Sequence, residues 1–214
     1  MATGGEEQDI RHEADDETPI TPESSKTRTS GIEWDQYFMG VALISAQRSK
    51  DPKTQVGACI VNPKNRIVGV GYNGMPDIDI KHNDDKFPWD KQTHYTKNKH
   101  LYVCHAEMNA IVNKMGADIQ GCTLYTTKYP CNECSKLIIQ SGIKKVVFLE
   151  NKEPDRDIYA ASRILLQTAN IVIKEHTPKG DLSGLYEESN TNTTKISPGK
   201  NVHSCFRRSM LFQV

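Results

Sequence analysis

Hydrophobic and polar positions follow two different periods in the first part of this chain. Apolar side chains recur at helical spacing from Trp34 to Ser45, which predicts a first helix ending near Asp51-Pro52. Two short apolar runs follow, at 56–61 and 66–72, with the turn sequence Asn-Pro-Lys-Asn between them. This pattern predicts a β-hairpin at one edge of a sheet.

Helical and strand-like patterns then alternate to about residue 176, with Gly142 as a helix stop. The alternation predicts an α/β fold with a largely parallel sheet that is covered on both faces. The predicted elements are helices at 105–115 and 131–141, a helix marked by apolar residues from 158 to 169, and strands at 122–127, 145–149 and 171–176.

The two ends of the chain have a different composition. Residues 1–30 are charged and rich in Ser, Thr and Pro, so we expect a disordered tail; 178–214 is also expected to be mostly disordered. The ordered domain is therefore predicted at 31–177. Within it, the polar stretch 74–99 predicts a loop or insertion long enough to have a functional role.

Charge and hydropathy limit the possible functions. Lys+Arg and Asp+Glu number 27 each, so the net charge is zero and offers no basic face for a polynucleotide. No apolar run approaches the ~18 residues of a membrane helix, and no signal pattern is present. We expect a cytoplasmic protein with no membrane partner, whose cysteines are core thiols or metal ligands.

Two segments carry the candidate chemistry: His-Ala-Glu at 105–107 and Pro-Cys-Asn-Glu-Cys at 130–134. Each opens a predicted helix, and together they read H-x-E…P-C-x-x-C, the signature of zinc nucleobase deaminases. Cys131 and Cys134 are three residues apart, so on a helix they can share one ion. With His105 they form three protein ligands and leave a fourth zinc position open for water.

Glu107 is the predicted catalytic residue, because it lies two residues from His105 without having to bind the metal. Zinc lowers the pKa of bound water, and Glu107 can take its proton as hydroxide attacks carbon 4 of cytosine. Glu107 then protonates ring nitrogen 3 and the departing ammonia. The acid also disfavours an inactive zinc-binding scaffold, since Glu107 has no structural task that requires a carboxylate.

The other cysteines give weaker signals. Cys59 and Cys122 lie in apolar strands and are interpreted as core residues, and Cys205 lies in the polar tail. Cys104 adjoins His105, but the chain direction argues against it as a further ligand.

The sequence resembles the deoxycytidylate deaminase family over about Trp34 to Ile173. The resemblance rests on "HAEMNAI", "PCNECSKLIIQSGIKKVVF", "AQRSKDPKTQVGACIVN" and "IVGVGYNGMP". Nucleoside cytidine deaminases usually place Cys where His105 stands. The deaminases of tRNA adenosine and of cytosine share His-Ala-Glu but lack a "GYNGMP" segment of this kind.

The resemblance implies a three-layer α/β/α sandwich with a five-stranded mixed sheet. It implies one Zn²⁺ per subunit and hydrolysis of dCMP to dUMP and ammonia, which supplies dUMP for thymidylate synthesis. It further implies a homohexamer activated by dCTP and inhibited by dTTP, with Mg²⁺ accompanying the triphosphate effector. The turn Gly71, Tyr72 and Gly74 is the candidate effector site by resemblance only.

Substrate contacts remain open between two interpretations. The amide of Asn73 suits a sugar hydroxyl or base edge, or else Asn73 is a turn residue before a glycine. Arg48, Ser49 and Lys50 suit a 5′-phosphate, or else they complement a helix C-terminus. The backbone N–H of Ala106 can bond to the base.

Two positions depart from relatives in the family. Some phage members use a Cys at the position of Asp51 for a second zinc, so we expect one zinc here and solvated side chains at His82, His94 and His100. Many members carry a Tyr linked to substrate binding where this chain has Glu153.

Overall fold

The structure is a computed structural model that describes residues 1, 31–76, 87, 89 and 95–178. The chain divides into two compact units, Met1–Gly31 and Ile32–Val214, and the elements below belong to the second. The tails predicted at 1–30 and 178–214, together with His82 and His94, lie almost wholly outside the described residues, so those expectations stay predictions.

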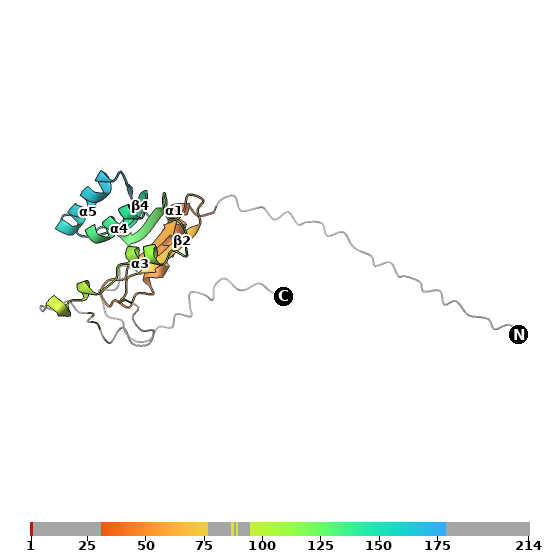
Figure 1. The fold of residues 1–214 in the computed structure, drawn as a ribbon, viewed down its shortest axis with the longest axis horizontal. Coiled ribbons are helices and arrows are strands. Elements are labelled where there is room, and N and C mark those ends of the chain that lie inside the picture. The colour runs from red at the N-terminus through yellow and green to blue at the C-terminus, as the bar shows by residue number, and fades with distance from the viewer. Residues whose placement is uncertain (2–30, 77–86, 88, 90–94, 179–214) are drawn as a thin grey trace. The chain divides into compact units, whose positions relative to one another are not determined.

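Five strands form one mixed sheet in the order β2-β1-β3-β4-β5 (Figure 1). The hairpin predicted from sequence forms its antiparallel edge, and β1 also pairs antiparallel with β3. The remaining neighbours, β3 with β4 and β4 with β5, are parallel. The strands are β1 (Gly57–Val61), β2 (Ile67–Tyr72), β3 (Thr123–Lys128), β4 (Lys145–Glu150) and β5 (Val172–Glu175).

Helices cover both faces of the sheet, which confirms the predicted three-layer α/β/α fold. On one face, α1 (Trp34–Ala46) packs on Cys59, Tyr125 and Val147. The opposite face packs on Ile60, Leu124 and Val146, and its helices are α3 (Ala106–Val112), α4 (Asn132–Gln140) and α5 (Asp157–Thr168). None of the helices in the described residues is long and apolar enough to cross a membrane.

The first helix ends earlier than the sequence pattern predicts. Helix α1 stops at Ala46, and the N–H groups of Gln47, Arg48 and Ser49 bond to carbonyls three residues back, at 3.2, 3.0 and 2.9 Å. These tighter bonds end the helix before Asp51-Pro52. Arg48 and Lys50 therefore lie beyond the last helical turn, which weakens their interpretation as partners of the helix dipole.

Glycine allows α3 to lie directly on β2. A Cβ atom at Gly71 would stand 2.3 Å from the carbonyl oxygen of Ala106 and from the backbone nitrogen of Ala110. Real Cβ atoms do not approach backbone that closely, so any side chain at 71 would push the start of α3 off the sheet. That start holds the His-Ala-Glu segment.

We predict opposite effects for two Gly-to-Ala substitutions. Gly71→Ala should lower the free energy of unfolding by about 3 kcal/mol or more, because the new methyl group would stand 2.3 Å from backbone atoms of α3. Gly40→Ala in α1 is the control: a Cβ there has no atom within 4 Å, so helix propensity should raise stability by up to about 1 kcal/mol. Denaturant unfolding measures both, and equal effects would contradict the packing argument.

Candidate active site

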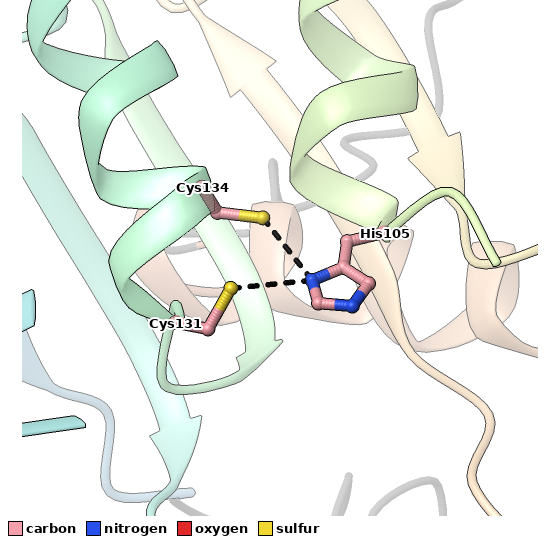
Figure 2. Close-up of side chains that lie close together, drawn as sticks. All are labelled: His105, Cys131 and Cys134. Atoms are coloured by element: carbon pink, nitrogen blue, oxygen red, sulfur yellow. Dashed lines mark hydrogen bonds between the residues drawn. The ribbon is translucent and has the colours of Figure 1, made fainter. Parts of the chain in front are cut away.

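Three side chains with metal-binding atoms converge at the N-terminal ends of α3 and α4 (Figure 2). The Nδ1 atom of His105 lies 3.3 Å from the Sγ of Cys131 and 3.3 Å from the Sγ of Cys134. All three ligand atoms lie within 4.8 Å of one another. The structure thus brings together the three residues that the sequence predicts as zinc ligands.

The local sequence explains this placement. His105 and Cys131 are both the residue before the first helical turn, with extended backbone (φ −75°, ψ 157° and φ −74°, ψ 171°), and Cys134 lies one turn into α4. Two buried hydroxyl groups hold the start of α4. The Ser162 hydroxyl donates to the Pro130 carbonyl at 2.8 Å, and the Ser135 hydroxyl donates to the Cys131 carbonyl at 2.9 Å.

The geometry and chemistry of this donor set fit zinc. Bond lengths of 2.0–2.3 Å around a tetrahedral ion place neighbouring ligand atoms about 3.5 Å apart, close to the separations from His105 to the two sulfurs. One imidazole and two thiolates leave the fourth position for another ligand, as in catalytic rather than structural zinc sites.

Hydrogen bonds among the three candidate ligands favour the thiolate form of Cys131. The hydrogen bond with Cys134 is the main cause that lowers the pKa of Cys131 to about 4, with His105 adding to it against the effect of burial. The bond to Cys131 in turn raises the pKa of His105 to about 9. The hydrogen bond to Cys131 and burial raise the pKa of Cys134, so this sulfur keeps its proton without metal. Zinc binding through one imidazole and two thiolates must therefore release the protons held by His105 and Cys134.

Glu107 lies beside the ligands in the first turn of α3. Its side chain is buried, with 4% of the residue exposed, and its Oε2 accepts from the Cys134 thiol at 3.5 Å. Burial raises the pKa of Glu107 above its usual value, although the charge on His105 partly opposes this. A carboxyl group with a raised pKa beside a metal site is suited to carry protons.

A cavity of about 160 Å³ opens beside this cluster, and His105, Glu107 and Cys131 line it. Of the predicted substrate-contact residues, Asn73 and Ala106 line it, whereas Arg48, Ser49 and Lys50 do not. The lining also includes four charged residues to which sequence analysis assigned no role in the site: Asp51, Lys99, Lys128 and Arg156.

Asn73 has a clear structural role. Its Nδ2 donates to the Thr54 carbonyl at 2.9 Å, and its Oδ1 accepts from the Val56 N–H at 2.8 Å. The side chain thereby ties the end of β2 to the segment that leads into β1. This role differs from both interpretations of Asn73 made from the sequence, and a contact with substrate stays a prediction.

A buried ion pair supports the same wall of the cavity. The Nζ of Lys99 donates to both carboxylate oxygens of Asp51, at 2.8 and 2.6 Å, and the two side chains are only 7% and 3% exposed. Asp51 Oδ1 also accepts from the N–H groups of Lys53 and Thr54. Lys99 belongs to the short 3-10 helix η2 (Lys99–Leu101), so this pair fastens the end of the long loop to the cavity.

The predicted effector-site residues lie elsewhere. Gly71 is buried under α3, Tyr72 is exposed, and none of Gly71, Tyr72 and Gly74 lines the cavity. Packing against α3 accounts for Gly71, and an effector site at this turn stays a prediction.

Known proteins are similar to this chain in sequence and in fold. The sequence model of the family described as "Cytidine and deoxycytidylate deaminase zinc-binding region" matches residues 32–150. The chain is 52% identical to mouse deoxycytidylate deaminase over 158 residues, which cover 73% of this chain and 86% of the mouse protein. It is 48% identical to a probable deoxycytidylate deaminase of Drosophila melanogaster over 165 residues, 74% of this chain and 79% of that protein.

Solved structures are similar to this chain in fold as well. The dCMP deaminase from the cyanophage S-TIM5, in complex with dCMP and dUMP, superposes with a TM-score of 0.53 at 28% identity. The match covers 69% of this chain and 99% of the phage chain.

The ion pair at the cavity wall yields a stability prediction. Lys99→Met should lower the free energy of unfolding by about 3–5 kcal/mol, because it leaves a buried carboxylate without its counter-ion. Lys136→Met, which breaks an exposed pair with Glu133, should cost less than about 1 kcal/mol. Adding Asp51→Asn to Lys99→Met should recover much of the loss in denaturant unfolding; no recovery would mean that the buried charge is not the cause.

Proposed function

This chain belongs to the cytidine and deoxycytidylate deaminase family, and we propose that it hydrolyses deoxycytidylate to deoxyuridylate and ammonia. The observation that carries the proposal is the buried Glu107 beside His105, Cys131 and Cys134, in the lining of the cavity that His105 and Cys131 share. Relatives that cover most of this chain support deoxycytidylate as the substrate.

His105, Cys131 and Cys134 would hold one zinc ion per chain. Zinc bound there supplies Lewis acidity, which makes water a nucleophile at neutral pH. Glu107 is the proton carrier: its carboxylate accepts a proton from the attacking water and donates it to ring nitrogen 3. It then accepts the proton of the new hydroxyl group on carbon 4 and donates it to the leaving amino group, so that ammonia departs as the carbonyl forms. Its burial keeps bulk water from competing for that proton.

The cavity walls would orient the nucleotide. The N–H of Ala106 lies at the start of α3, beside His105, and is proposed to bond to the base. Asn73 is proposed to stabilise the wall that faces the sugar, since its amide is engaged with Thr54 and Val56. Arg48, Ser49 and Lys50 stay candidates for the phosphate on the sequence alone.

Family membership also supports a wider role. The product dUMP would supply thymidylate synthesis in the cytosol, and the chain would act as a homohexamer that dCTP with Mg²⁺ activates and dTTP inhibits. We place the effector at the turn of Gly71, Tyr72 and Gly74, where Tyr72 is exposed.

The role of Glu107 can be tested directly. Glu107→Gln should keep bound zinc and the fold but lower kcat for dCMP by about 10²–10⁴-fold, because the amide cannot carry the proton. Glu133→Gln is the matched control: this acid lies on α4, 64% exposed, and should leave kcat within about twofold. Ammonia release and metal analysis provide the readouts, and an active Glu107→Gln variant would refute the proton-carrier role.

The substrate can be tested with the wild-type chain. We expect kcat/KM for dCMP to exceed that for deoxycytidine and for cytosine by about 10²-fold or more, because several charge-assisted contacts to phosphate are lost with the latter two. Equal values for the nucleotide and the nucleoside would contradict the choice of dCMP. Preference for cytosine would point to another branch of the family.

A further inference from the structure

The charges that line the cavity do not cancel. Its lining includes the cations Lys99, Lys128 and Arg156 and the carboxylates of Asp51 and Glu107. Lys99 is fully engaged by Asp51, at 2.6 and 2.8 Å. Glu107 lies beside the metal-binding residues and is assigned to proton transfer. Lys128 and Arg156 are therefore the cations that remain to meet a bound anion.

Lys128 is the last residue of β3, two residues before Pro130. Its side chain is half-buried, and no carboxylate among the residues that the structure describes forms an ion pair with it. A cation that is partly removed from water without a counter-ion favours binding of a negative group. Lys128 thus marks a position in the cavity where an anion would be stabilised.

Arg156 has a partner, but a weak one. Its Nη1 lies 3.2 Å from Oε2 of Glu153, and the two side chains are 51% and 54% exposed. An exposed pair of this kind contributes little to stability. The guanidinium carries five N–H donors, so the single contact to Glu153 leaves most of them for another acceptor.

The turn that carries Arg156 is fixed against α5. The N–H of Arg156 donates to the Glu153 carbonyl at 3.2 Å, and Nη2 of Arg163 donates to the Pro154 carbonyl at 3.2 Å. The acids of this turn, Glu153, Asp155 and Asp157, are exposed and do not line the cavity, whereas Arg156 does. Arg156 is also the residue before the first turn of α5, and no side chain caps that helix end.

From this arrangement we propose that Arg156 and Lys128 form the subsite for the 5′-phosphate of the nucleotide, an inference that rests on the proposed deamination of dCMP. A phosphate monoester carries a charge of about −1.5 to −2 at pH 7 and three acceptor oxygens. It therefore displaces the singly charged Glu153 from Arg156. Before binding, Glu153 holds the guanidinium near the cavity; on binding, it competes with the substrate.

This subsite differs from the one that the sequence suggests at Arg48, Ser49 and Lys50. Those residues follow α1 and lie outside the lining of the cavity, and Ser49 is buried with its hydroxyl accepting from the Asp51 N–H at 3.3 Å. The two assignments predict different sensitive residues, so substitution separates them.

The test compares kcat/KM for dCMP and for deoxycytidine in single variants. Arg156→Gln should lower the value for dCMP about ten- to hundredfold and leave that for deoxycytidine within about twofold, because only the nucleotide loses a charge-assisted contact. Lys128→Gln should lower the dCMP value about tenfold, again selectively. Lys136→Gln on the exposed face of α4 is the control and should change neither value.

Glu153→Gln tests the competition. Removing the carboxylate should raise kcat/KM for dCMP by about two- to fivefold in the wild-type background and have no effect when Arg156 is already Gln. If the pair of Glu153 with Arg156 only stabilised the fold, Glu153→Gln would not raise kcat/KM selectively for dCMP and only when Arg156 is present.

Two results would overturn the assignment. One is an unchanged preference for dCMP over deoxycytidine in both Arg156→Gln and Lys128→Gln, with a selective loss in Lys50→Gln or Arg48→Gln. The other is an equal loss on both substrates, which would indicate damage to the fold. A wild-type chain that does not deaminate dCMP would instead refute the proposed function itself, so the two failures are distinguishable.

Discussion

The close contact of helix α3 with strand β2 determines the geometry of the whole site. With no side chain at Gly71, the carbonyl of Ala106 and the backbone nitrogen of Ala110 lie where a Cβ would otherwise stand. The helix start is thereby held on the sheet, and His105 reaches both sulfurs of α4 at 3.3 Å. The same turn of α3 buries Glu107, so one packing contact positions His105 and the proposed proton carrier together.

Charge in the cavity is arranged in two groups. Asp51 and Lys99 neutralise each other. Their ion pair joins η2, at the end of the loop predicted at 74–99, to the part of the cavity lining that contains Asn73. Lys128 and Arg156, of which Arg156 has only an exposed pair with Glu153, are the cations proposed to bind the phosphate. A chain with no net charge can therefore bind a small anion, because what matters is the local excess of cations within a few ångströms and not the sum over the surface.

The sequence predicted the features that depend on local spacing. The H-x-E and P-C-x-x-C segments each open a helix, and helix starts follow from a few neighbouring residues, so His105, Cys131 and Cys134 were found without knowledge of the fold. The alternating pattern likewise predicted the order of helices and strands. The pairing of Asp51 with Lys99 could not be predicted, because the two residues are 48 positions apart and meet only in the folded chain.

Two features of the structure, the end of α1 and the position of Arg156, could not be predicted from the spacing of hydrophobic residues. The sequence placed the end of the first helix near Asp51-Pro52, but bonds to the third preceding carbonyl end α1 at Ala46, so Arg48 and Lys50 lie beyond the helix. Arg156 lies in a stretch of acids, and no role was assigned to it from the sequence. Only the fold shows that its side chain lines the cavity while those acids do not.

The most direct test of the central claim is to measure zinc content and ammonia release from dCMP before and after metal removal. One zinc per chain, lost activity and full recovery on adding zinc are expected; undiminished turnover by the metal-free chain would contradict the account.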